Sequence, residues 1–149
     1  MVIKRTLNRL LRLRELEEEL SRLQLEIAVA ERSRREQEVA LAASSQAQGR
    51  RSFAAGIGEQ NQLIRTAGLL ESEEARKRLL RLQPHLETAD LEVIRQQAEF
   101  LSRRTGRRQV ETLLENEMTQ AEVETGRRAQ QMLDDWYGRR IVKKTGGRS

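Results

Sequence analysis

Apolar side chains recur at intervals of three and four residues along the first third of the chain. The spacing is the a/d pattern of a coiled-coil heptad. Glutamates at positions 15, 17, 18 and 19 fall outside the series, and its continuation through Arg34, Gln37, Leu41 and Ser44 is less apolar. We predict a helix over about residues 4–52 that buries the first part of this series. The series consists of Leu13, Leu16, Leu20, Leu23, Ile27 and Ala30.

A second series with the same spacing lies in the middle of the chain and predicts a second helix over about residues 60–138. Six of its seven members are apolar, and no stretch alternates with the period of two that a strand requires. Pro84 lies inside this series, where it removes a backbone hydrogen bond, so we expect a kink there. A break that gives three helices is the alternative. The series is Leu79, Leu82, Leu86, Ala89, Val93, Gln96 and Phe100.

Between the two series the chain reads RSFAAGIGEQNQ, with glycines at 56 and 58. A phosphate-binding loop needs a preceding strand and, in its Walker form, a Lys-Ser or Lys-Thr pair. Here a polar helix precedes, and Glu59 follows the second glycine. We therefore predict a bend at about residues 53–59, because glycine supplies positive φ angles in tight helix–helix turns.

Folding the two helices back on each other about the glycines predicts which residues face one another. Partner numbers that add to about 113 bring Leu13 to Phe100 and Leu20 to Val93. A register shifted by one heptad, with numbers that add to about 120, also satisfies the period. We prefer the first register because it centres the turn on the glycines. The predicted fold class is all-α: a long antiparallel two-helix coiled-coil hairpin with a C-terminal helical overhang.

In the preferred register residue 3 faces residue 110, so about 30 residues of the second helix lack an internal partner. They still carry an apolar stripe, which usually marks an interaction surface. The chain's single Trp and Tyr lie at its end, where such residues are favoured binding anchors. Self-association of two arms and packing against the N-terminal leucines are the alternatives. The predicted partner-binding residues of this arm are Val110, Leu113, Leu114, Met118, Ala121, Met132, Leu133, Trp136, Tyr137, Arg139 and Arg140.

Charge and composition narrow the function. Charged residues make up 34% and aromatic residues 3% of the 149, and the net charge is +5. A basic tail, expected to be flexible, occupies 141–149. Arg103, Arg104, Arg107 and Arg108 surround Gly106 and either contact acidic loops or phosphates or form a solvated face. Residues 1–140 form one predicted coiled-coil domain.

The sequence shows no set of residues that would be expected to converge in a catalytic site. It has no cysteine, its one histidine is His85, and its carboxylates are scattered among arginines on helix faces. Acid–base chemistry needs convergent groups with perturbed pKa values. We expect no enzyme, metal, cofactor or small-molecule substrate. We expect a cytoplasmic protein, because no apolar run is long enough to span a membrane and the N-terminal residues do not resemble a secretory signal.

The chain resembles the FliJ proteins of the bacterial flagellar type III export apparatus. The resemblance covers nearly the whole chain: length, basic charge, absence of cysteine, the N-terminal Leu/Glu/Arg helix, the small-residue bend near 56 and the run RRQVETLLENEMTQAEVETGRRAQQMLDDW. The family's Glu-x-Leu-rich helix and later acidic pair are matched by Glu111, Leu113, Leu114, Asp134 and Asp135. Trp136, Tyr137 and Pro84 depart from the family pattern.

The resemblance implies a stalk protein that inserts into the hexameric flagellar export ATPase, activates it and couples it to the membrane export gate. It also implies an escort role with export chaperones and export substrates, and a place at the inner membrane at the flagellar base. The charge of the basic tail is compatible with contact to the membrane surface or to acidic loops of a partner. Two other classes remain open. One is a basic coiled coil that binds nucleic acid or ribosomes, which the few aromatic stacking platforms disfavour. The other is a structural coiled-coil homodimer.

Overall fold

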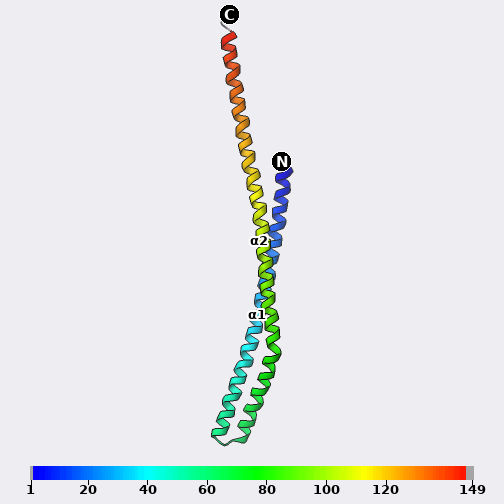
Figure 1. Cartoon of the computed structure of the whole chain (residues 1–149), viewed down its shortest axis with the longest axis vertical. Coiled ribbons are helices and arrows are strands. Elements are labelled where there is room, and N and C mark those ends of the chain that lie inside the picture. Colours follow the sequence, from blue (N-terminus) through cyan, green and yellow to red (C-terminus); the bar gives the residue numbers. More distant parts are fainter. Residues whose placement is uncertain (1, 147–149) are drawn as a thin grey trace. The chain divides into compact units, whose positions relative to one another are not determined.

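The computed structural model describes residues 2–146, and two long helices occupy nearly all of them (Figure 1). Helix α1 spans Val2–Gly58 and helix α2 spans Gln62–Gly146. The helices pack against each other, and the described residues contain no strand. The all-α two-helix hairpin is therefore confirmed. Internal packing divides the chain into two units, residues 17–103 and residues 2–16 with 104–146, which are described in turn.

The turn between the helices lies just beyond the glycines. Gly56 and Gly58 are still part of α1, and no described glycine has a positive φ. Gln60 takes that conformation instead, with φ of 55°. The amide of Asn61 donates to the Gly56 carbonyl at 2.9 Å, and the amide of Gln60 donates to the Ile57 carbonyl at 3.3 Å. These two bonds form a Schellman motif, with glutamine where glycine is usual. The prediction that the glycines make the bend is wrong.

Asn61 begins the second helix. Its side-chain Oδ1 accepts hydrogen bonds from the amides of Leu63 at 3.1 Å and Ile64 at 3.3 Å. The first amides of a helix have no intrahelical acceptor, and an Asn side chain at the N-cap supplies one. The sequence EQN therefore ends α1 and starts α2 within three residues.

Contacts between the helices in the unit of residues 17–103 fix the register. Arg103 Nη1 lies 3.2 Å from Glu17 Oε2, and Arg32 Nε lies 3.9 Å from Asp90 Oδ1. Partner numbers thus add to about 120, which is the register that we considered and did not prefer. The register near 113 is wrong because α1 continues to Gly58 and the turn is centred on Gln60.

The buried face of α1 in this unit is made of small residues. Each follows the last by seven or fourteen positions, so all lie on one stripe of the helix. A Cβ added to Gly49 would lie 2.5 Å from the Ser72 amide nitrogen, and one added to Gly68 would lie 2.5 Å from the Phe53 amide nitrogen. The two backbones therefore touch, and only small side chains fit between them. The buried residues of α1 are Ser21, Ala28, Ala42, Gly49 and Gly56.

The close approach of the helices changes the role of the leucine series on α1. Leu20 is 58% exposed, Leu23 44% and Ile27 70%, and the earlier members Leu13 and Leu16 are exposed as well. The prediction that this series is buried is wrong: a one-residue change of phase puts Ser21 and Ala28 inside. The heptad period alone does not choose between neighbouring phases, and here the space between the backbones decides.

The series on α2 is buried as predicted. Ala89, Val93 and Gln96 are buried, with Val93 only 2% exposed. The others, Leu79, Leu82, Leu86 and Phe100, are half-buried. Gln96 brings a polar group into this seam: its Nε2 donates to Glu92 Oε1 at 2.9 Å.

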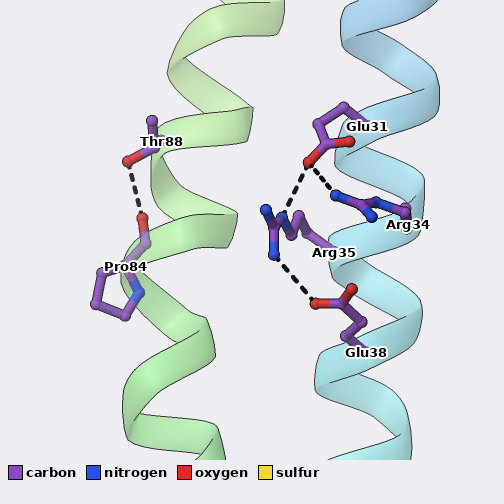
Figure 2. A network of polar contacts seen from close by, with 6 residues as sticks. All are labelled: Glu31, Arg34, Arg35, Glu38, Pro84 and Thr88. Atoms are coloured by element: carbon purple, nitrogen blue, oxygen red, sulfur yellow. Dashed lines mark hydrogen bonds and ion pairs between the residues drawn. The ribbon is translucent and has the colours of Figure 1, made fainter.

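Helix α2 continues through Pro84 without a break, so the three-helix alternative is wrong. Pro84 is exposed on the surface of α2, and the hydroxyl of Thr88 donates a hydrogen bond to the Pro84 carbonyl at 2.9 Å (Figure 2). On α1, Glu31 accepts hydrogen bonds from Arg34 and Arg35 at 2.9 and 3.0 Å, also drawn in Figure 2. The polar face of the hairpin is thus held mainly by pairs within each helix, which contribute a few tenths of a kcal/mol each.

In the second unit, residues 2–16 pack beside the first part of residues 104–146. Val110 is 5% exposed, and Leu7, Leu10, Leu11 and Leu114 are half-buried. Helix α2 extends to Gly146, beyond the predicted end near 138, so residues 141–146 of the expected flexible tail are helical. The last three residues of that tail lie outside the described part of the chain.

Candidate functional site: the C-terminal arm

The last 29 described residues of α2, residues 118–146, have exposed side chains throughout, and we term them the C-terminal arm. The predicted overhang begins at 110, eight residues too early. Val110 is buried and Leu114 half-buried, whereas Leu113 is exposed. The difference follows from the register, because partner numbers near 120 place residue 3 opposite residue 117 or 118.

Large apolar side chains remain exposed along the arm. They include predicted binding residues and three that the sequence argument did not single out: Val123, Ile141 and Val142. In water such groups cost roughly 25 cal/mol for each square ångström of apolar surface that is left unburied. The arm is therefore the part of its unit best suited to gain from binding. Its exposed apolar residues are Met118, Ala121, Val123, Met132, Leu133, Trp136, Tyr137, Ile141 and Val142.

An aromatic and basic cluster lies near the end of the arm. The rings of Trp136 and Tyr137 are 5.1 Å apart in an edge-to-face arrangement, with 77° between their planes. The guanidinium carbon of Arg140 lies 5.1 Å from the centre of the Trp136 ring. A cation–π contact at an exposed site contributes about 0.5–1 kcal/mol, enough to bias the rotamers of both side chains.

The four bases of this region share one side of the helix. At about 100° per residue, Arg139, Arg140, Lys143 and Lys144 fall on the side of Trp136. Asp135 precedes Arg139 by one turn, and Asp134 and Asp135 line a shallow hollow together with Arg139 and Lys143. None of the four bases forms an ion pair among residues 2–146, and all are exposed. The C-terminal end of a helix favours positive charge, so the cluster suits its position. It remains available to an acidic partner.

Two of the four arginines around Gly106 form ion pairs with glutamates of the described chain, and two do not. Arg103 donates to Glu17 and Glu99, at 3.2 and 2.9 Å. Arg107 bonds Glu111 at 2.6 Å. Arg104 and Arg108 are exposed and form no ion pair within residues 2–146. Only two of the four arginines are therefore open to a ligand without breaking an existing pair.

The described residues contain no group of histidine, aspartate or glutamate side chains arranged to hold a metal ion. Within residues 2–146 neither helix has a stretch apolar enough to cross a bilayer. The hollow at the start of the arm is open and lined by Lys4, Glu117, Met118, Ala121, Glu122 and Thr125. It offers mixed polar and apolar surface and no convergent chemistry.

No described protein family, curated protein or solved structure matches the chain. The surfaces of the molecule and the resemblance seen in its sequence are therefore the features that bear on its function.

One surface was missed from the sequence altogether. The predicted buried seam on α1 includes its leucine series, so the sequence does not predict these leucines as binding residues. A signal for the correct phase was present: small residues occupy 21, 28, 42, 49 and 56, five of the six heptad positions from 21 to 56, and Arg35 occupies the sixth. Such a stripe is typical of helices whose backbones approach closely.

Proposed function

We propose that the protein is a stalk and general chaperone component of flagellar type III export. In this role it binds and activates the hexameric export ATPase, couples it to the membrane export gate, and cooperates with export chaperones. It would act in the cytoplasm, peripherally associated with the inner membrane at the flagellar base. The observation that carries the proposal is the C-terminal arm, a helical extension with apolar and aromatic side chains and no internal partner.

Three features support this role. A two-helix hairpin is the fold that the resemblance implies. The arm presents Met132, Leu133 and Trp136 beside arginines, a combination that often dominates binding energies. Ion pairs within each helix leave a charged surface of both signs, suited to contact with several ring subunits in turn. The proposal is non-catalytic, because the protein would act on an ATPase that does the chemistry.

The test is size-exclusion chromatography and ATP turnover of the flagellar export ATPase from the same organism, with and without this chain. We expect co-elution, ring assembly and faster hydrolysis. A double variant, Leu133→Asp with Trp136→Ala, should weaken binding more than tenfold while circular dichroism stays unchanged, since both side chains are exposed. Leu70→Asp, an exposed leucine near the turn, is the matched control.

Absence of binding and stimulation at micromolar concentrations of both folded proteins would overturn the proposal. The second candidate is nucleic-acid binding, which is favoured by the four bases near Trp136 that form no ion pair within residues 2–146. Such binding would weaken steeply with salt, because counterions are released from phosphates. Salt-sensitive retention of heterologous RNA or DNA, lost in Arg139→Gln with Lys143→Gln, would support that candidate instead.

A further inference from the structure

A stretch of α1 presents an apolar stripe away from its partner helix. We term Leu20, Leu23, Ile27 and Ala30 the outer stripe. They are spaced by three, four and three residues, the pattern of a helix that packs on another helix. All four are exposed, on a helix whose opposite face is already buried against α2. Within residues 2–146, no other segment buries the outer stripe.

The charge around the outer stripe is strongly negative. Residues 17–31 contain five glutamates and one arginine, a net charge of −4. Glu19 and Glu26 flank the stripe, and both bond the same Arg22, at 2.5 and 2.6 Å. One guanidinium therefore serves two carboxylates, and negative charge is left over. The facing segment of α2, residues 90–103, has three acids and two bases and does not offset it.

This pattern selects the kind of helix that fits. Two outer stripes packed on each other would set glutamates against glutamates, which is destabilising. A fitting helix needs apolar residues at spacings of three and four with bases beside them. The C-terminal arm comes closest to that form. Ala129, Met132, Leu133 and Trp136 lie on one side of it, and bases lie before and after them: residues 127–146 carry six bases and two acids, Asp134 and Asp135, a net charge of +4.

We propose that the outer stripe of one copy binds the C-terminal arm of a second copy. The contact pairs a segment of net charge −4 with an arm of net charge +2, which is +4 over residues 136–146, and it buries apolar surface on both sides. It joins two different surfaces, so it is heterologous and can extend beyond two chains. The inference does not depend on the export role. If both hold, self-docking covers the arm in the free protein, and the ATPase must displace it.

The absence of cysteine allows a direct test with purified full-length chains. Variants Leu23→Cys, Leu133→Cys and Ile94→Cys are prepared, one of each pair with an affinity tag, and mixed two at a time under mild oxidation. We expect a disulfide-linked dimer mainly from Leu23→Cys with Leu133→Cys. Gln48→Cys, an exposed site away from the stripe, gives the background rate.

Each other pattern overturns the proposal. Efficient linking of Leu23→Cys to itself means that two outer stripes pair. Linking of Leu133→Cys to itself means that two arms pair. Linking of Leu23→Cys to Ile94→Cys means that the exposed face of α2 is the occupant. No linking above background, at concentrations up to hundreds of micromolar, means that the stripe does not bind a second copy.

Sedimentation velocity supplies a second readout. We expect association that grows with concentration and weakens at least tenfold between low and high salt, because opposite charges are screened. Leu20→Asp should weaken it at least tenfold. The matched control is Leu80→Asp, since Leu80 on α2 is also 58% exposed and its loss should change association less than twofold. Equal effects of both variants would overturn the proposal. Neither experiment contains the ATPase, so its outcome is separate from that of the export role.

Discussion

The two faces of α1 in the unit of residues 17–103 differ in side-chain size more than in polarity. The inner face presents Ser21, Ala28, Ala42, Gly49 and Gly56, and the outer face presents Leu20, Leu23 and Ile27. A pattern of apolar residues would put the larger ones inside. Here backbone contact at Gly49 and Gly68 excludes them. The core is stabilised by close contact of two backbones, and the larger apolar groups are left for binding.

Filling the inner face should have the largest effect on stability. In Gly49→Leu the new Cβ would lie 2.5 Å from the Ser72 nitrogen and 2.7 Å from the Gly68 carbonyl oxygen, both backbone atoms. The helices must separate, at a cost in unfolding free energy of about 3 kcal/mol, the upper end for overpacking. Gly106→Leu is the control, because nothing lies within 4 Å of its added Cβ. It should gain about 0.5–1 kcal/mol from helix propensity. Chemical denaturation measures the change in unfolding free energy of each variant. If both variants were stabilised, or both destabilised, close backbone contact at Gly49 would not be what excludes large residues from the inner face.

The next largest effect should come from shortening a buried side chain, compared with shortening an exposed one on the outer face of α1. Val93→Ala removes buried methyl groups from the seam, at about 0.8 kcal/mol for each group plus a cavity cost, or about 2 kcal/mol in all. Leu20→Ala on the outer face should change the unfolding free energy by less than about 0.5 kcal/mol. Thermal denaturation at low protein concentration, where self-association is absent, is the measurement. A larger loss from Leu20→Ala would mean that the outer stripe is core.

The turn offers an effect of intermediate size. Asn61→Ala removes the acceptor for the Leu63 and Ile64 amides and should lower the unfolding free energy by about 1 kcal/mol. Gln60→Gly should act in the opposite direction, because the left-handed conformation costs an L-residue about 1 kcal/mol or more. Urea denaturation of the two variants checks the signs. If Gln60→Gly were destabilising, the greater backbone entropy of glycine in the unfolded chain would outweigh the relief of the left-handed strain at position 60.

The smallest effect concerns pH. Hydrogen bonds from Arg95 and then Gln96 lower the pKa of Glu92 from 4.5 to about 2. A carboxyl whose pKa is lower in the fold stabilises it fully above the ordinary pKa, and this contribution is lost between about pH 4.5 and pH 2. Glu92→Gln should therefore be slightly less stable than the wild type at pH 7, and the difference should shrink as the pH falls from about 4.5 through 2. Glu59→Gln, in the turn, is the control. A difference that stays unchanged from pH 7 down to pH 2 would rule out the carboxylate as its source.

The paired part of α2 and the C-terminal arm differ in how well their residues could be predicted from sequence. Most of the arm's apolar residues, and Arg139 and Arg140, were identified from sequence because they do not depend on a partner's position, whereas Val123, Ile141 and Val142 were not. Val110 and Leu114 were assigned to it wrongly, since the start of the arm depends on where α1 ends opposite α2. A register shift of one heptad moves that point by about seven residues.

The sequence by itself determined that the chain is helical, that it forms two long helices, and that Ala89, Val93 and Gln96 face inward on the second. Propensity and the heptad period are local properties, and both are written in the order of the residues. Tertiary structure decided the phase of α1, the register and the position of the turn. Those depend on how closely two backbones approach. That distance is set jointly by Gly49 and Gly68 on different helices, and the heptad period of the large apolar residues within one helix does not reveal it.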